Sequence, residues 1–183
     1  MEPEVITLNI KQMLRQNLLW TFILSIVLLT LNVLVHKPYL HFSFGSILFD
    51  CFIFFVLYSI LIILHEIFHL IGFMLFGKAP FSSLSYGIKL DQGIAYATTN
   101  KLLTNRAMKA SLMLPFWMTG VIPTVLGFFI NSNMLILVGS FLMAGAVGDF
   151  MMYKQLRKYP NHYLVKDDPN LPRLTVYPVP QDK

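Results

Sequence analysis

Residues 47–76 read ILFDCFIFFVLYSILIILHEIFHLIGFMLF, a run of thirty residues that are almost all apolar. A helix needs about 20 mostly apolar residues to cross the roughly 30 Å hydrocarbon core of a membrane. This run would make a helix about 45 Å long, so the helix must tilt, break or project from one face. We expect Asp50 to lie near one membrane interface, and Gly72 and Gly77 to end the helix at the other.

Three more apolar runs are long enough to cross a membrane, and they cover residues 18–35, 110–130 and 134–153. Of the 183 residues, 56% are hydrophobic and only 13% are charged, whereas soluble domains average about 25% charged residues. The sequence therefore predicts an all-α membrane protein. We expect one membrane-embedded domain, residues 1–183, with four transmembrane helices.

Lysine and arginine are distributed unevenly between the segments that connect these runs. Thirteen lie in residues 1–17, 77–109 and 154–183, and one, Lys37, lies between the first two runs. Positively charged residues near membrane helices stay in the cytoplasm. The sequence therefore predicts a multi-pass protein of the cell membrane with both termini and the long loop in the cytoplasm. The net charge of +5 thus reflects topology, and we expect the lipid bilayer as a partner and no nucleic acid.

The long loop contains two segments in which small or polar residues alternate with apolar ones, residues 83–90 and 94–99. A three-residue turn that ends in Gly93 joins them. Alternation at period two on both sides of a short glycine-containing turn is typical of a β-hairpin. We expect a cytoplasmic hairpin over about residues 83–99, with Gly93 in the left-handed conformation; the alternative is an irregular linker.

The second apolar run contains the motif His65-Glu66-Ile67-Phe68-His69. Each ionisable group at the centre of a bilayer costs at least about 2.5 kcal/mol, so such groups usually mark functional sites. Residues i and i+4 share one face of a helix, which lets His65 and His69 reach one zinc ion. Glu66 lies beside them and is placed to act as the general base. The alternative is a polar cluster that joins helices by hydrogen bonds or lines a proton path.

A catalytic zinc ion usually has three protein ligands and one water molecule. The position of the third histidine in a metzincin is occupied by Leu75, and no glutamate follows the motif. The remaining downstream candidates are Asp91, Asp149, His162, Asp167, Asp168 and Asp182. Only Asp149 lies inside an apolar run, and loop charges place it at the same depth as the two histidines. We therefore predict Asp149 as the third ligand, with Asp91 or Asp167 as the next candidates; otherwise Asp149 pairs with a neighbouring helix.

The motif on a membrane helix, followed by a hairpin, two further spans and Gly148-Asp149, resembles the putative zincin peptidase membrane family. That family is distantly similar to the site-2 intramembrane metalloproteases. Leu114-Pro115-Phe116, at the start of the third run, and the tail segment at residues 165–169 also resemble the family's pattern. The similarity extends from Ile47 to the tail. The Asn-x-x-Pro motif of the site-2 proteases has no counterpart here, so the group that would stabilise the oxyanion is not identified.

The residues and the resemblance together predict a zinc-dependent, membrane-embedded endopeptidase. Its metal ligands would be His65, His69 and Asp149, and Glu66 would be the catalytic base. We expect the substrate to be a membrane or membrane-proximal protein or peptide. One alternative is a non-proteolytic protein in which zinc is structural, transported or sensed, and another is a catalytically inactive regulatory partner. Glu66 favours the enzyme, because a structural zinc site does not need that carboxylate. The oligomeric state is left open.

Overall fold

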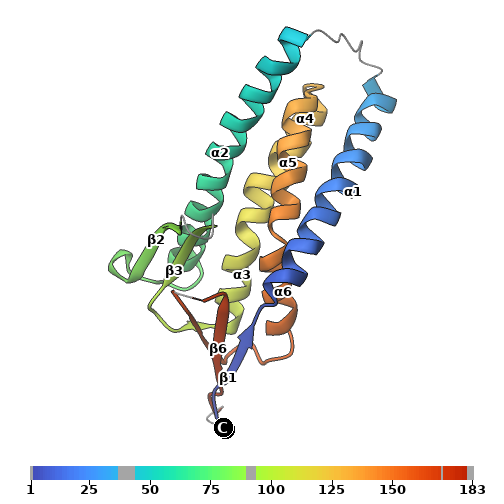
Figure 1. Cartoon of the computed structure of the whole chain (residues 1–183). Coiled ribbons are helices and arrows are strands. Elements are labelled where there is room, and N and C mark those ends of the chain that lie inside the picture. Colours follow the sequence, from blue (N-terminus) through green and yellow to red (C-terminus); the bar gives the residue numbers. More distant parts are fainter. Residues whose placement is uncertain (1, 37–43, 90–93, 170, 181–183) are drawn as a thin grey trace.

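The computed structural model describes residues 2–36, 44–89, 94–169 and 171–180. Long helices run side by side, and two small antiparallel sheets lie at one end of them (Figure 1). The helices are α1 (Ile10–His36), α2 (Phe44–Leu75), α3 (Asn105–Pro115), α4 (Ile122–Phe129), α5 (Asn133–Gly145) and α6 (Val147–Leu156). They form four stretches that are long and apolar enough to cross a membrane. The sequence-based expectation of four such helices agrees with this arrangement.

Two of the four stretches are interrupted. A π-helical segment, Phe116–Val121, separates α3 from α4, and a break at Ala146 separates α5 from α6. The third stretch begins at Asn105, earlier than the predicted start at residue 110, because the hydroxyl of Thr104 accepts a hydrogen bond from the backbone N–H of Ala107 and caps the helix. The segment at residues 114–116 therefore lies inside the stretch and does not open it.

The helix α2 is continuous over 32 residues. Gly72 lies inside it, so the prediction that Gly72 helps to end the helix was wrong. The end comes at Gly77 and Lys78, where Lys78 takes the left-handed conformation with φ 50°. The backbone N–H groups of Gly77 and Ala79 both donate to the carbonyl of Phe73, which satisfies a carbonyl at the helix end that has no partner within the helix.

The strands β2 (Leu84–Lys89) and β3 (Ile94–Thr99) pair in an antiparallel register. The two alternating segments of the long loop therefore form paired strands, as predicted. The turn that joins them, including Gly93 and Asp91, lies outside the described residues.

A second sheet has four antiparallel strands in the order β1-β6-β5-β4. Its strands are β1 (Glu4–Thr7), β4 (Leu103–Thr104), β5 (Leu164–Asp167) and β6 (Arg173–Tyr177). The fold is mostly helical with small sheets, so the prediction of an all-α protein with one hairpin was incomplete. Strands of two to five residues are too short to show a clear alternation.

The main core lies where the four-stranded sheet meets the ends of the helices. It includes Met108 from α3, Leu156 from α6, and Leu103, Val165 and Val176 from the sheet, all of them at most 1% exposed. This packing ties the sheet to α3 and α6. As a result, β1 and β6, which lie far apart in the sequence, are both held against the ends of α3 and α6.

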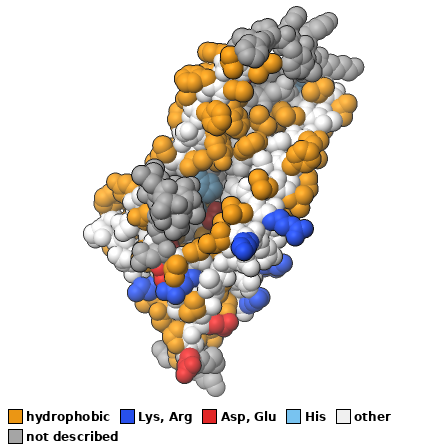
Figure 2. All heavy atoms as spheres, in the orientation of Figure 1, with side chains coloured by type: hydrophobic (Ala, Val, Ile, Leu, Met, Phe, Trp, Pro, Cys, Tyr) orange, Lys and Arg blue, Asp and Glu red, His pale blue; other side chains and the backbone are white. Residues whose placement is uncertain are grey.

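The outer surfaces of the helices are apolar, whereas lysine and arginine side chains gather toward the sheet end (Figure 2). Phe22 is 67% exposed and Phe129 80% exposed, as expected for side chains that face lipid. In the part of the chain that the structure describes, every lysine and arginine lies at the sheet end or in the segments beyond it. The charge pattern of the sequence therefore corresponds to one physical end of the molecule.

Polar side chains hold α1 against α5. The amide nitrogen of Asn32 donates to the side-chain oxygens of Asn131 and Asn133 at 3.1 and 2.9 Å. About two turns nearer the sheets, the hydroxyls of Ser25 and Ser140 lie 2.9 Å apart. Hydrogen bonds between helices in lipid average about 0.6 kcal/mol each, so these contacts orient α1 rather than dominate its stability.

Asn105 joins the beginning of α3 to the end of α6. Its side chain is completely buried, and its amide nitrogen lies 3.0, 2.8 and 3.0 Å from the carbonyl oxygens of Leu156, Tyr159 and Pro160. The carbonyls of Leu156 and Pro160 also accept from the backbone N–H groups of Tyr159 and Tyr163, so the Asn105 amide adds to the hydrogen bonds at the end of α6.

We expect Asn105→Ala to lower the free energy of unfolding by about 1–3 kcal/mol, because the hydrogen bonds from this buried amide to the end of α6 would be lost. Denaturation of the detergent-solubilised protein would measure the change. The matched control is Asn100→Ala, since Asn100 is exposed, and its effect should stay within about 0.5 kcal/mol. Equal losses in the two variants would show that the Asn105 amide does not hold α3 to α6.

Candidate metal centre

The helix α2 presents His65 and His69 on one face, one turn apart. Both side chains are buried, with 9% and 7% of the residue surface exposed. Their rings meet edge to face, with centroids 5.1 Å apart and an angle of 76° between the planes. The spacing of four residues in the motif produces this arrangement directly, because it corresponds to slightly more than one helical turn.

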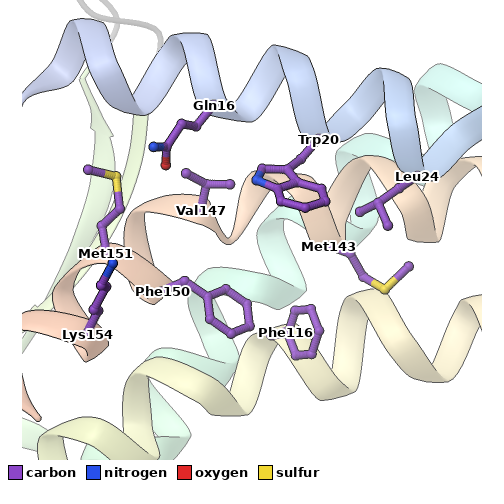
Figure 3. Close-up of a pocket in the computed structure, with 9 residues that line it drawn as sticks. All are labelled: Gln16, Trp20, Leu24, Phe116, Met143, Val147, Phe150, Met151 and Lys154. Atoms are coloured by element: carbon purple, nitrogen blue, oxygen red, sulfur yellow. The ribbon is translucent and has the colours of Figure 1, made fainter.

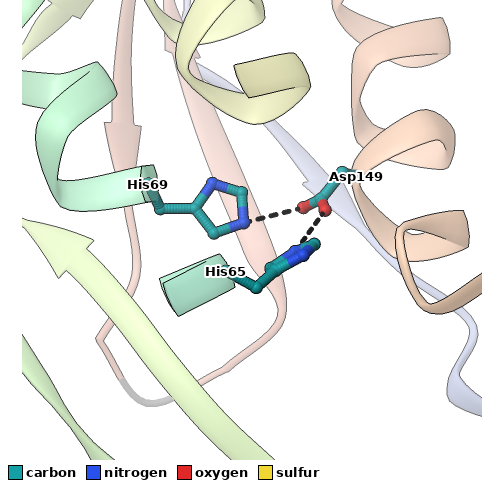
Figure 4. Close-up of side chains that lie close together, drawn as sticks. All are labelled: His65, His69 and Asp149. Atoms are coloured by element: carbon teal, nitrogen blue, oxygen red, sulfur yellow. Dashed lines mark hydrogen bonds and ion pairs between the residues drawn. The ribbon is translucent and has the colours of Figure 1, made fainter. Parts of the chain in front are cut away.

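Asp149 faces the two histidines from the first turn of α6 (Figure 4). The Nε2 atom of His65 lies 3.3 Å from Asp149 Oδ2, and the Nε2 atom of His69 lies 3.5 Å from Asp149 Oδ1. One ligand atom from each of the three residues can be chosen so that all lie within 4.8 Å of one another. The structure thus brings together the three residues that the sequence proposed as ligands.

The Nδ1 atoms of both histidines have hydrogen-bond partners on the third stretch. His69 Nδ1 lies 3.2 Å from the carbonyl oxygen of Ser111, which can only accept, so Nδ1 carries the proton. His65 Nδ1 lies 3.2 Å from the hydroxyl of Thr119. That hydroxyl donates to the carbonyl of Pro115 at 2.9 Å, so it accepts from His65. In both rings the neutral tautomer therefore directs the Nε2 lone pair toward Asp149.

Two local features of the backbone make these hydrogen bonds possible. At Gly72, α2 approaches α3 so closely that a β-carbon would lie 2.8 Å from the Cα atom of Ser111. Only glycine allows the carbonyl of Ser111 to come within reach of His69. The π-helical segment after Pro115 carries Thr119 and directs it toward His65; π-helical turns within α-helices often occur at functional sites.

The chemistry of this donor set fits zinc. Two imidazole nitrogens and a carboxylate are a common set of three protein ligands in catalytic zinc sites. With bonds of 2.0–2.1 Å and tetrahedral angles, adjacent ligand atoms lie about 3.3 Å apart, and the two distances from Asp149 to the histidines are 3.3 and 3.5 Å. A cation between them would also remove the repulsion between two nitrogen lone pairs and a carboxylate. That these residues bind zinc stays a prediction.

A cavity of about 290 Å³ opens beside the three residues. Glu66, which is partly buried, lines it from α2. Tyr96 and Ala97 line it from β3, and the four-stranded sheet adds Asp167 and Arg173. A histidine side chain, pale blue, is visible within a hollow of the surface (Figure 2). The cavity therefore gives a substrate-sized space next to Glu66, and both sheets contribute to its walls.

The other candidate ligands have different positions. Asp167 lines the cavity, and burial raises the pKa of its carboxyl group to about 6. Asp168 accepts a hydrogen bond of 2.7 Å from Nε of Arg173. The ring of His162 packs edge to face against Tyr163. In the part of the chain that the structure describes, none of these three belongs to the group of potential ligands around His65.

Two further candidates from the sequence, Asp91 and Asp182, lie outside the described residues. Sequence reasoning missed the parts played by Ser111 and Thr119. Ser111 acts through its backbone carbonyl, which no side-chain pattern reveals. Thr119 is one of three hydroxyl-bearing residues in an apolar run, a weak signal that gains meaning only from its position opposite His65. Arg173 was also missed, because only the possible metal ligands of the tail were considered as residues near the motif.

Comparison with known proteins gives one match. Residues 58–164 fit the model of a family described as putative zincin peptidase. The matched segment is more than half of the 183 residues and contains His65, Glu66, His69 and Asp149. No curated protein and no solved structure matches the chain. The match confirms the resemblance to the zincin peptidases, whereas the more distant similarity to site-2 proteases stays a prediction. The chain belongs to the putative zincin peptidase family.

Proposed function

We propose that this protein is a zinc-dependent endopeptidase embedded in a membrane, and that it hydrolyses peptide bonds of a membrane or membrane-proximal protein. The family suggests zinc metallopeptidase activity. The observation that carries the proposal is the convergence of His65, His69 and Asp149, with both histidine Nδ1 atoms held by acceptors. Such partners of the outer ring nitrogen are typical of histidines that bind metals.

The same proposal includes the location and orientation of the chain. Four long apolar helices support an integral membrane protein, and the basic residues at the sheet end support a cytoplasmic position for both termini and both sheets. Residues 1–183 would then form one membrane-embedded domain in the cell membrane. The metal centre would lie inside the membrane near its cytoplasmic face.

Zinc held by His65, His69 and Asp149 would act as a Lewis acid on the scissile carbonyl and increase the acidity of the attacking water. Glu66 would accept a proton from that water as its oxygen bonds to the carbonyl carbon. The Glu66 carboxyl group would then pass the proton to the leaving nitrogen as the carbon–nitrogen bond breaks. The position of Glu66 in the cavity wall, one residue from His65, supports this role.

The strand β3 offers a way to hold the substrate. Two of its residues, Tyr96 and Ala97, line the cavity, and among the described residues β3 pairs only with β2. An extended peptide could add to the other edge of β3 through main-chain hydrogen bonds, and this would bring its backbone past Glu66. An alternative role for the pair β2–β3 is simply to connect α2 with α3 and cover the site.

We expect the purified protein to contain about one zinc ion per chain, and His65→Ala combined with His69→Ala to remove it. Asp149→Ala should weaken zinc binding, because one of three protein ligands would be lost. Metal analysis after dialysis would measure the content. His36→Ala is the matched control, since His36 lies at the exposed far end of α1. If the double variant kept its zinc, the proposed centre would be excluded.

Thr119→Val should weaken zinc binding about 10–100-fold, because His65 would lose the acceptor that fixes its tautomer. Competition with a chelator would measure the affinity. Thr124→Val is a close control: Thr124 is also buried and also donates to the carbonyl four residues earlier, that of Gly120, but no hydrogen bond between it and His65 is present. An equal effect of the two substitutions would mean that Thr119 acts only through packing.

Glu66→Gln should keep the zinc and lower the rate of peptide cleavage by about 10²–10⁴-fold, because an amide cannot accept the proton. Cleavage of a membrane-anchored reporter peptide by the reconstituted protein would measure the rate, and zinc analysis of the same sample would verify the centre. Normal cleavage by this variant would argue against the general base. An intact zinc site in a wild-type protein that cleaves no peptide would favour the non-proteolytic alternative.

A further inference from the structure

A second cavity lies away from the metal centre, between α1 and the helices that carry Asp149 and its neighbours (Figure 3). Its volume is about 320 Å³. Most of its lining is apolar: Trp20 and Leu24 come from α1, and Phe116, Met143 and Phe150 face them from the third and fourth stretches. Half of the Trp20 side chain remains exposed, so this cavity is open to the surroundings of the helices.

A polar cavity of about 260 Å³ adjoins the apolar one at the sheet end. The two share Gln16, Met151 and Lys154 as lining residues. The remaining lining of the polar cavity is mostly uncharged and hydrogen-bonding: Thr7, Asn9, Gln12 and Gln155, together with Leu8. The two cavities together form one groove, here called the α1/α6 groove, that is apolar at one end and polar at the other.

The residues of α1 that line the groove follow one helical stripe. Gln12, Gln16, Trp20 and Leu24 are spaced by four residues, so they lie on one face. Along this face the character changes from amide to apolar in the direction away from the sheets. If the helices cross a membrane as proposed, the polar end lies at the cytoplasmic interface and the apolar end extends into the hydrocarbon.

The only charged side chain that lines either cavity is Lys154. It is exposed and lies at the junction of the polar and apolar parts, close to the end of α6. Within the described ranges no carboxylate forms an ion pair with it. The groove therefore presents one positive charge, amide groups on one side of it, and an apolar channel on the other.

We propose that the α1/α6 groove binds an anionic phospholipid of the cytoplasmic leaflet. The phosphate would lie at Lys154 among the glutamine amides, and an acyl chain would extend past Trp20 and Leu24. Basic pockets between membrane helices on the cytoplasmic side suit acidic head groups. A zwitterionic lipid could fill the apolar part equally well, but it would gain less from Lys154. A transmembrane helix of a substrate protein fits less well, because it would leave the hydrogen-bonding groups of the polar cavity without a charged partner.

The chain offers a matched pair of reporters, because its only two tryptophans are Trp20 and Trp117. Trp20 lines the groove, whereas Trp117 is 56% exposed and lines neither cavity. The full chain would be reconstituted in vesicles of phosphatidylcholine and phosphatidylglycerol, with bromine on the acyl chains of one lipid at a time. Trp117→Phe reports on Trp20 alone, and Trp20→Phe reports on Trp117 alone.

Quenching of Trp20 should show about a fivefold preference for phosphatidylglycerol, the size expected for one lysine beside an anionic lipid. The two brominated lipids should quench Trp117 about equally, so the ratio of phosphatidylglycerol to phosphatidylcholine quenching should be near one. Lys154→Gln should bring the preference at Trp20 close to one, and Lys154→Arg should restore it. Lys109→Gln should leave it unchanged, because the Lys109 amine donates to Asn161 and lines neither cavity. If Lys154→Gln does not fold, Gln16→Glu should lower the preference instead, because it adds a negative charge beside Lys154.

Equal preferences at the two tryptophans would overturn the proposal, and so would an unchanged preference in folded Lys154→Gln. Absence of quenching at Trp20 by either lipid would show that something other than lipid fills the groove. Soluble glycerol phosphate should not change the preference, since the acyl chain supplies part of the binding. The measurement needs neither zinc nor peptide cleavage, so it can fail while the proposed enzymatic function holds, and the reverse is also true.

Discussion

Two imidazoles and a carboxylate lie among helices whose outer surfaces are apolar, and each of their polar atoms needs a partner. An unpaired polar group in such surroundings costs several kcal/mol. This constraint determines how α2, α3 and α6 pack. The carbonyl of Ser111 must come close to His69, which requires glycine at position 72. The hydroxyl of Thr119 must face His65, and the π-helical segment directs it there. The break before α6 then places Asp149 opposite both rings.

Much of this arrangement could be predicted from the sequence, because the signals were local. Long apolar runs indicate membrane-length helices by their length alone. Ionisable residues inside such a run indicate a functional site, because placing them in a membrane costs free energy. Asp149 could be found by elimination, since so few downstream groups could bind a metal. The strands β2 and β3 were visible because each alternates over six residues. The predicted starts of two helices were too late, because their first turns contain charged or polar residues that do not belong to an apolar run. These are α1, with Lys11 in its first turn, and α3, which begins at Asn105.

The rest could not be predicted, because the interactions are distant in sequence or involve the backbone. The four-stranded sheet pairs Glu4 with Val176 and Leu103 with Val165, and β4 contains only two residues. No periodicity can identify such a strand. The contact between His69 and Ser111 uses a carbonyl that every residue possesses. Asp167 entered the sequence argument only as a substitute ligand, and its position in the cavity wall depends on the sheet that the sequence did not reveal.

The pairing of β1 with β6 joins two strands that are separated in the sequence by all four long apolar helical stretches. His65, His69 and Asp149 are all present in a chain that has reached the end of α6, but the wall supplied by Arg173 and Leu174 is not. On the ribosome, the cavity therefore stays incomplete until β6 has emerged. Packing of α2 against α3 and α6 therefore does not depend on β6, whereas the cavity wall that contains Arg173 is added only when β6 pairs with β1 and β5.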